Sequence, residues 1–330
     1  MRVLVTGGGG FLGRAVCRRL AEAGHQVRAL NRRPRPGPDA HGVEQRTGDI
    51  RCRADVLAAA DGCDAVVHCA AMAGAWGPVA EYHAVNVLGT RHVLDACQEL
   101  GVTRLVYTSS PSVVHNGTDL NGVDESAPYA TRWTAPYPRT KALAERMVLA
   151  ANSPRLATVA LRPHIIWGPG DPHFLPRLAD RARRGRLYLV GDASRLIDTV
   201  YIDNAADAHL LAVERLSPGA PIAGRPYFIT QGDPRPIGEI VRALVAAAGV
   251  TPRPRHLPVA VARPLATAVE SAYRLLGVRR EPPLTRFLVE QFTTAHWFTI
   301  EAARRDLGYR PRVSIEEGLA VLGERLRARS

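Results

Sequence analysis

The segment Thr6-Gly-Gly-Gly-Gly-Phe-Leu-Gly13 stands between an apolar run, Arg2–Thr6, and a stretch of helical periodicity, Phe11–Ala23. Its glycines fit the spacing G-x-x-G-x-x-G. The first permits a tight turn, the second lets the backbone approach a pyrophosphate, and the third lets the helix pack closely on the strand. The N-terminus of the following helix presents free N–H groups and a positive dipole end to the phosphates. The glycines of this predicted dinucleotide-binding loop are Gly7, Gly10 and Gly13.

From this segment outward, short apolar runs alternate with helical stretches as far as residue 167. Strands that are apolar throughout and separated by helices indicate a parallel sheet covered on both faces. We therefore expect an α/β fold, a doubly wound parallel sheet of Rossmann type, over residues 1–167, with later strands returning from about residues 196–230. Residues 168–330 are expected to form mainly a smaller C-terminal substrate-binding lobe. The expected strands are Arg2–Thr6, Gln26–Leu30, Gly42–Thr47, Asp64–Cys69, Thr103–Thr108 and Leu156–Arg162, and the expected helices include Phe11–Ala23, Val79–Leu100 and Tyr137–Ala151.

The composition is that of an ordinary globular protein. Of 330 residues, 46% are hydrophobic and 22% charged, which excludes a disordered chain. No run of eighteen apolar residues occurs, and the start of the chain does not resemble a signal peptide, so we expect a cytoplasmic protein without a transmembrane anchor. The five cysteines show no C-x-x-C spacing and the eleven histidines no H-E-x-x-H pair. Neither a disulfide framework nor a metal site is therefore expected.

The net charge of +12 comes from an unusual set of basic residues, 42 arginines and a single lysine. So lopsided a usage indicates a coding bias toward arginine. The densest run, Arg177–Arg186, has no interleaved aromatic residues to stack on bases, and no nucleic-acid partner is expected. A basic surface does favour phosphorylated cofactors and carboxylate substrates.

The end of the second predicted strand bears on the choice of cofactor. An acid there would hydrogen-bond a free ribose 2′-hydroxyl, whereas this chain has Asn31, Arg32 and Arg33. Guanidinium groups offer a planar set of donors to a 2′-phosphate. The sequence therefore favours NADP over NAD.

Two further strand ends are expected to border the cofactor. Asp49 and Ile50 follow the third strand, where they would hold the adenine by hydrogen bonding and by contact. Ala70 and Ala71 follow the fourth, where small side chains leave room for the cofactor across the sheet edge. These positions follow from the rule that ligands of such folds bind at the carboxyl ends of the strands.

The lysine stands four residues after a tyrosine, in Tyr137-Pro-Arg-Thr-Lys141. On a helix, residues i and i+4 share a face, so phenol and ammonium would point into one site. A compact ammonium lowers the pKa of a phenol and can bind the nicotinamide ribose, which explains one lysine among 42 arginines. We expect Tyr137 to transfer a proton and Lys141 to tune it. The alternative is a partly exposed helix start with an incidental ion pair.

A serine cluster, Thr108-Ser-Ser-Pro-Ser112, ends the fifth predicted strand. A hydroxyl there can donate to a carbonyl oxygen and orient it against Tyr137. Ser110 is our prediction, with Ser109 and Ser112 as alternatives, since a serine in such a cluster can also be a loop or cap residue. The order of glycine loop, serine cluster and Y-x-x-x-K makes the joint interpretation stronger than its parts.

These motifs, together with LRPHIIWGPGD (residues 161–171), carry a family resemblance. The chain resembles the extended short-chain dehydrogenase/reductase superfamily and, within it, the 3β-hydroxysteroid dehydrogenase-like family, from Arg2 to about Leu322. The resemblance implies catalytic roles for Ser110, Tyr137 and Lys141, and a supporting role for Asn86. Many extended members keep an acid at the end of the second strand, which Asn31-Arg32 replaces here. The cofactor contacts that it implies are Gly7, Gly10, Phe11, Leu12, Gly13 and Pro163.

Segments where substrate loops are expected narrow the resemblance. AGAWG (73–77), YIDNAADAH (201–209) and PLTRFLVEQFTTAHW (283–297) are similar to the bacterial 2-alkyl-3-oxoalkanoate reductases of olefin and β-lactone biosynthesis. This implies reduction by NADPH of the 3-keto group of a hydrophobic 2-alkyl-3-oxoalkanoate to the 3-hydroxy acid. Oxidation of a 3β-hydroxysteroid with NAD(P) is the alternative. A dinucleotide sensor without catalysis and a nucleotide-sugar epimerase are less favoured, the first because the Tyr137/Lys141 pair is intact.

Other features leave alternatives open. The substrate carboxylate needs a donor, and His115, His164, His173 and Arg195 are equal candidates. The apolar stripe of Leu257–Leu276 suits a wall over an apolar ligand, a membrane-surface helix or a plain core helix. The resemblance implies a homodimer formed through the helices predicted at residues 79–100 and 137–151, and association with enzymes of the same pathway.

Overall fold

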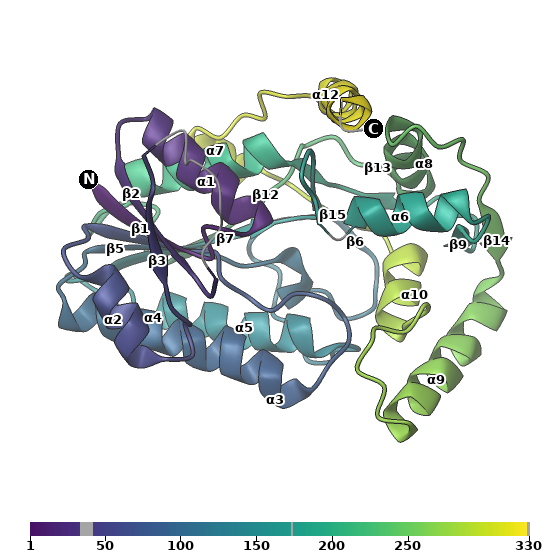
Figure 1. Ribbon diagram of the computed structural model, residues 1–330, viewed down its shortest axis with the longest axis horizontal. Coiled ribbons are helices and arrows are strands. Elements are labelled where there is room, and N and C mark those ends of the chain that lie inside the picture. The colour runs from purple at the N-terminus through teal and green to yellow at the C-terminus, as the bar shows by residue number, and fades with distance from the viewer. Residues whose placement is uncertain (34–41, 173, 329–330) are drawn as a thin grey trace.

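A computed structural model describes residues 1–33, 42–172 and 174–328 of the chain. Its centre is a seven-stranded sheet in the order β12-β7-β5-β4-β1-β2-β3, in which every neighbouring pair is parallel (Figure 1). The strand order reverses between β1 and β4, which is where ligands bind in such sheets. The strands are β1 Arg2–Thr6, β2 Gln26–Asn31, β3 Glu44–Thr47, β4 Ala65–His68, β5 Arg104–Thr108, β7 Ala157–Pro163 and β12 Arg225–Ile229.

Helices cover both faces of this sheet. Helices α1 and α7 pack together on one face, and α2, α4 and α5 cover the other (Figure 1). Strands β4 and β7 are buried along their whole length, as expected where neither face meets water. The doubly wound Rossmann architecture predicted from the alternating runs is confirmed. The bounds are α1 Phe11–Glu22, α2 Arg53–Ala60, α4 Gly89–Glu99, α5 Pro136–Ala150 and α7 Ile202–Arg215.

The helix predicted at residues 79–100 forms as three consecutive segments. α3 (Val79–Tyr82) runs into a π-helical segment, η1 (His83–Leu88), which continues into α4. Wider turns of this kind occur frequently at functional sites. Asn86, the supporting residue implied by the family resemblance, lies within η1.

Most of the remaining elements lie beside the main sheet (Figure 1). Their strands pair in short sheets, β13-β10-β15-β6, β11-β8 and β14-β9, so that distant segments such as β6 and β15 lie side by side. The strands are β6 Leu120–Val123, β8 Ile166–Trp167, β9 Tyr188–Val190, β10 Leu196–Ile197, β11 Val200–Tyr201, β13 Arg235–Pro236, β14 Arg255–Leu257 and β15 His296–Phe298. The helices are η2 Pro111–Val113, α6 Phe174–Arg183, α8 Ile237–Ala247, α9 Val259–Leu275, α10 Arg286–Thr293, α11 Glu301–Leu307 and α12 Ile315–Arg327.

The face of helix α9 that packs against the protein is not the face that carries its apolar stripe. Ala262 and Glu270 are buried, whereas Leu265 and Leu276, on the stripe, are 44% and 74% exposed. The Glu270 carboxylate accepts hydrogen bonds from the backbone N and Nε of Arg286, at 2.7 and 2.9 Å, at the start of α10. A polar contact therefore joins α9 to α10. In the described part of the chain, no helix has both the length and the apolarity needed to cross a membrane.

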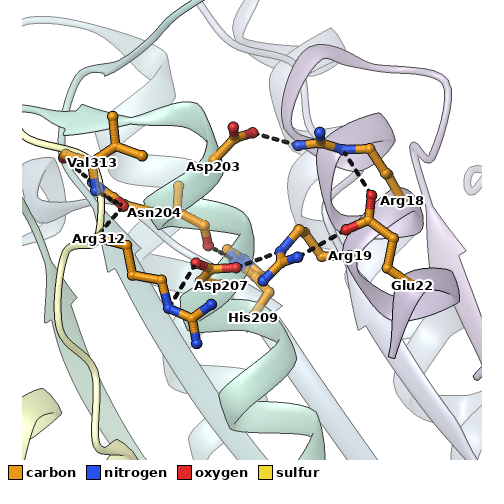
Figure 2. Close-up of polar contacts among 10 residues, drawn as sticks. Arg18, Arg19, Glu22, Asp203, Asn204, Asp207, His209, Arg312 and Val313 are labelled. Atoms are coloured by element: carbon orange, nitrogen blue, oxygen red, sulfur yellow. Dashed lines mark hydrogen bonds and ion pairs between the residues drawn. The ribbon is translucent and has the colours of Figure 1, made fainter. Parts of the chain in front are cut away.

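Helix α1, which begins at the glycine loop, is tied to α7 by ion pairs (Figure 2). Arg19 Nε donates to Asp207 at 2.5 Å. Asn204, also on α7, accepts from the backbone N–H groups of Arg312 and Val313 at 2.9 and 3.1 Å, which holds the C-terminal segment against the same helix. These contacts fix the direction of α1 and of its N-terminus. A second ion pair between α1 and α7 joins Arg18 to Asp203 (Figure 2).

Candidate active site

The glycine loop has a shape that larger residues would disrupt. Gly7 has a φ of +70°, and a Cβ there would lie 2.9 Å from the backbone of Ala70 at the end of β4. A Cβ at Gly13 would lie 2.1 Å from the Gly7 carbonyl oxygen, so α1 packs directly on the loop. Gly10 precedes α1, and among the described residues no side chain caps this helix end. The loop therefore fits a dinucleotide pyrophosphate held by the N–H groups of α1. The first helical residues, Phe11 and Leu12, are half-buried.

The three residues predicted at the end of β2 lie in two different settings. Asn31 is engaged with the protein, because its Oδ1 accepts from Gly9 N at 2.5 Å and its Nδ2 donates to Gln45 Oε1 at 2.8 Å. Arg32 and Arg33 are both exposed. Asn31 therefore holds the glycine loop in place through its bond to Gly9. Arg32 and Arg33 are exposed cations that follow the same strand.

Asp49 and Ile50 follow β3 as predicted. The Asp49 carboxylate accepts from Arg51 Nη2 at 2.6 Å, a bond that lowers the pKa of Asp49. Ile50 is buried against Gly89, where a Cβ would lie 2.7 Å from Ile50 Cδ1. Ile50 thus seats the start of α4, and the side chain of Asp49 is the more accessible of the two. After β4, Ala70 is half-buried and Ala71 is exposed.

A cavity of about 330 Å³ opens at the ends of β5 and β7. Ser110 and Tyr137 line it together, and the Ser110 hydroxyl opposes the rise in the pKa of the phenol. Ser110 Oγ lies 2.9 Å from Ser112 Oγ, whereas Ser109 Oγ is buried without a partner in the described chain. Of the three serines, Ser110 is therefore the one whose hydroxyl acts on the phenol. The cavity is lined by Thr108–Ser112, His115, Tyr137, Pro163–Ile166, Phe287, Gln291, His296 and Phe298.

The phenol and the ammonium have different surroundings. Burial raises the pKa of Tyr137, and the Ser110 hydroxyl opposes that shift. Lys141 Nζ donates to the Thr108 carbonyl oxygen at 2.5 Å, at the end of β5. Burial lowers the pKa of Lys141 to about 7, against the opposing charge of Glu145. Lys141 is thus anchored to Thr108, a residue that lines the cavity.

Asn86 holds the start of α5 in place. Its Oδ1 accepts from Met72 N at 2.7 Å, and its Nδ2 donates to Thr140 Oγ1 at 3.0 Å. Thr140 lies inside the segment from Tyr137 to Lys141, while Met72 belongs to the loop after β4. Asn86 is therefore a positioning residue that fixes the catalytic helix against that loop.

The sequence analysis did not single out His209, which supports the same strand end. His209 Nδ1 donates to the Ala205 carbonyl at 2.7 Å, so the neutral ring accepts from Thr108 Oγ1 at Nε2, 2.8 Å away. Burial lowers the pKa of His209 to about 4, which keeps the ring neutral. Thr108 is the residue whose carbonyl binds Lys141. A histidine on a distant helix gives no local signal for this contact.

The loop of residues 73–77 joins the main sheet to α9. Trp76 Nε1 donates to the Val278 carbonyl at 3.1 Å, and its ring meets that of Tyr273 edge-on at a centroid distance of 6.2 Å. Tyr82 OH donates to the Gly74 carbonyl at 2.9 Å and holds the loop from the other side. The resemblance in this segment thus coincides with a contact between the two parts of the molecule.

Of the four residues considered for the substrate carboxylate, two line the cavity, His115 and His164. A third imidazole, His296, joins them there and was not predicted. Arg195 is half-exposed and engaged in an ion pair at 3.3 Å, and His173 lies outside the described residues. Among the described residues, no group of three or more metal-ligating side chains is placed to hold a metal ion.

Comparison with known proteins decides the family. Residues 4–259 match the 3-beta hydroxysteroid dehydrogenase/isomerase family. The chain belongs to this family. It is an NAD(P)-dependent oxidoreductase of the extended short-chain dehydrogenase/reductase type, as the glycine loop and the Y-x-x-x-K spacing predicted.

Relatives of this family member cover nearly its whole length. The 2-alkyl-3-oxoalkanoate reductase of Stenotrophomonas maltophilia is 54% identical over 325 residues and covers 98% of each chain. The 3-beta-hydroxysteroid dehydrogenase of Mycolicibacterium neoaurum is 37% identical over 332 residues, covering 97% of this chain and 89% of that protein. The structure of MoeE5 in complex with UDP-glucuronic acid and NAD matches with a TM-score of 0.77 and 26% identity over 100% of both chains. The predicted family resemblance is confirmed.

Proposed function

We propose that this family member catalyses the NADP-dependent reduction of the 3-keto group of a hydrophobic 2-alkyl-3-oxoalkanoate to the 3-hydroxy acid. The cavity that Ser110 and Tyr137 line together carries this proposal, because both hydroxyls can donate to one carbonyl oxygen bound there. The 54% identity to a relative named for that activity supports the substrate class. Oxidation of a 3β-hydroxysteroid is the second candidate, favoured by the 37% identical relative.

In the proposed mechanism, Ser110 and Tyr137 hydrogen-bond the keto oxygen, and Tyr137 gives its proton as negative charge develops there. NADPH, when bound, supplies the hydride to the keto carbon. Burial raises the pKa of Tyr137, so the phenol stays protonated at neutral pH and is ready to donate in the reductive direction. Lys141, whose pKa is about 7, exchanges protons at the strand end. Asn86 keeps the helix that carries both residues in place.

The exposed arginines after β2 are proposed to select NADP. Replacing both Arg32 and Arg33 by alanine should lower kcat/KM for NADPH by about 10- to 100-fold, because a charge-assisted hydrogen bond to phosphate contributes about 1.5–3 kcal/mol. The value for NADH should change little. Initial rates with each cofactor measure the ratio. Arg184→Ala, which removes an exposed arginine beside α6, is the control, and an unchanged NADPH/NADH ratio in the double variant would place 2′-phosphate recognition elsewhere.

Turnover with two substrate classes tests the function itself. A 2-alkyl-3-hydroxyalkanoic acid and a 3β-hydroxysteroid are each offered with NADP and with NAD. We expect NADP-dependent oxidation of the fatty acid with kcat/KM about 100-fold or more above the sterol, because the sites for the two skeletons differ in shape over many contacts. Sterol turnover with NAD would replace the proposal by its alternative. Cofactor binding without turnover of either would indicate a dinucleotide sensor.

We further propose, from the family resemblance, that the protein is cytoplasmic and serves olefin or β-lactone biosynthesis. Two copies are proposed to associate through the helices α3–η1–α4 and α5. Leu88 and Leu143 on these helices are 42% and 37% exposed, which supports an apolar contact there.

A further inference from the structure

Three buried imidazoles share the cavity with Ser110 and Tyr137. His115, His164 and His296, called here the histidine cluster, are each at most 7% exposed. The ring of His296 lies 5.6 Å from that of His115 and 5.0 Å from that of His164, edge-on in both cases. Among the cavity-lining residues of the described chain there is no lysine or arginine. These rings are therefore the cavity-lining groups that could carry a positive charge, while the other side-chain donors there are neutral, among them those of Ser109, Ser110, Ser112, Tyr137 and Gln291.

In two of the three rings, the N–H group already donates a hydrogen bond to another part of the protein. His296 Nε2 donates to the Gln291 carbonyl oxygen at 2.9 Å. His115 Nε2 lies 3.0 Å from Thr294 Oγ1, whose own proton goes to the Glu290 carbonyl at 2.8 Å, so His115 is the donor. Burial lowers the pKa of both histidines, which keeps them neutral. Neither ring has a second N–H with which to hold a ligand.

His164 is different, because its tautomer depends on a buried acid. His164 Nδ1 lies 3.8 Å from Asp198 Oδ1, and neither atom has a hydrogen-bond partner in the described chain. Asp198 Oδ2 accepts from Phe298 N at 2.7 Å, which holds the carboxyl group in place. Burial raises the pKa of Asp198 to about 7, so the acid is protonated below that pH and ionised above it. A small side-chain adjustment would bring the pair into hydrogen-bond contact.

The state of Asp198 then decides what His164 offers to the cavity. A protonated Asp198 donates to Nδ1, so the neutral ring carries its proton on Nε2 and can donate to a ligand. An ionised Asp198 accepts from Nδ1–H, so Nε2 is left with a lone pair that repels a carboxylate. The other acids facing the cluster are Glu290, whose Oε1 lies 3.6 Å from His115 Nδ1, and Asp119, which is ion-paired with Arg195.

We propose that the histidine cluster is the subsite for the carboxylate of the substrate, that His164 Nε2 is its donor, and that Asp198 is a positioning residue whose proton sets His164 in the donating tautomer. The inference rests on the proposed function. It selects His164 among the candidates left open by the sequence. Carboxylate binding then requires two protons on the Asp198–His164 pair, one on Asp198 and one on His164 Nε2.

The pH dependence follows directly. Below about pH 7 the pair holds both protons and the carboxylate binds without further uptake. Above it, binding must draw a proton from solvent, so the affinity for the acid falls by up to about tenfold per pH unit. A methyl ester of the same acid carries no charge, so its affinity should not fall as the pH rises.

Calorimetry on the full chain saturated with NADPH measures the proton directly. The 2-alkyl-3-hydroxyalkanoic acid forms a dead-end complex with the reduced cofactor, and titrations in buffers of different ionisation enthalpy count the protons taken up. We expect about 0.9 proton per acid bound at about pH 8 and about 0.1 at about pH 6, and none for the ester. Equal affinity for acid and ester with no proton uptake would overturn the inference. If neither ligand bound and neither was turned over, the proposed function itself would have failed.

Two variants separate this role from a structural one. In Asp198→Asn the amide can donate to His164 Nδ1 at every pH, so the acid should bind at about pH 8 as tightly as at about pH 6, without proton uptake. In His164→Phe the affinity for the acid should fall about 10- to 100-fold, with the ester unchanged. His256→Gln, at an exposed histidine of β14, is the control. A pH dependence that survives in Asp198→Asn contradicts the proposal.

Discussion

Replacing Tyr137 by phenylalanine should lower kcat by about 10²- to 10⁴-fold, because the phenol is the proposed proton donor to the developing alkoxide. The substitution removes one oxygen from a half-buried side chain at the start of α5 and should leave the helix intact. KM for the cofactor should stay within a few fold, since the glycine loop and the β2 end are untouched. Steady-state rates with the keto acid and NADPH measure both quantities.

Two controls define this result. Tyr188→Phe removes a phenol that is 47% exposed on β9 and should leave kcat unchanged. A cofactor-binding titration of Tyr137→Phe shows whether the variant is folded. If the folded variant keeps kcat within about tenfold of the parent, Tyr137 is not the proton donor, and Ser110 becomes the first residue to replace.

Replacing Glu145 by glutamine should reduce the free energy of unfolding by about 3–5 kcal/mol, because it leaves the guanidinium of Arg162 buried without its counter-charge. Glu145 is 0% exposed and accepts from Arg162 Nη2 at 2.6 Å and from Tyr129 OH at 2.7 Å. The pair lies one turn along α5 from Lys141 and joins that helix to β7. Urea unfolding followed by circular dichroism measures the loss from the shift in midpoint.

Asp180→Asn provides the matched comparison for Glu145→Gln. It breaks the exposed ion pair with Arg184, and a surface pair of this kind contributes at most about 1 kcal/mol. The two substitutions change the same functional group and differ in burial. Equal losses in both variants would mean that the buried charge of Arg162 is solvated by some other route.

Local pattern was sufficient to predict the sheet and the residues at its strand ends. Strands β4 and β7 are buried along their whole length, and β1 along all but its first residue, because both faces of the sheet are covered. Each of these segments is rich in valine, leucine or alanine, and that composition can be read without knowledge of the fold. The glycine loop could be predicted in the same way, because Gly13 packs against Gly7 within the loop itself, although the contact of Gly7 with Ala70 comes from a distant strand end. The four-residue spacing of Tyr137 and Lys141 predicted that both side chains lie on one face of a helix, and both residues belong to α5.

Contacts between segments that are distant in the sequence could not be predicted from local sequence patterns. Asp198, His164 and His296 meet only because β15 pairs with β10 and β6, a register that no local periodicity encodes. The bond from Lys141 to the Thr108 carbonyl likewise depends on how α5 docks against β5. Helix α9 is a case in which the local pattern misled. Its apolar stripe suggested which face would pack, but the buried carboxylate of Glu270, bonded to Arg286, lies on the face that does.

The solitary lysine gives this protein a built-in spectroscopic label. A chain grown on isotope-enriched lysine carries a single side-chain ammonium, that of Lys141, and this group is 2% exposed at the end of β5. Its resonance therefore reports on that one strand end, free of overlap from any other lysine. An amine-directed dye or resin meets a buried ε-amine at this position, so it should leave the side chain of Lys141 unmodified.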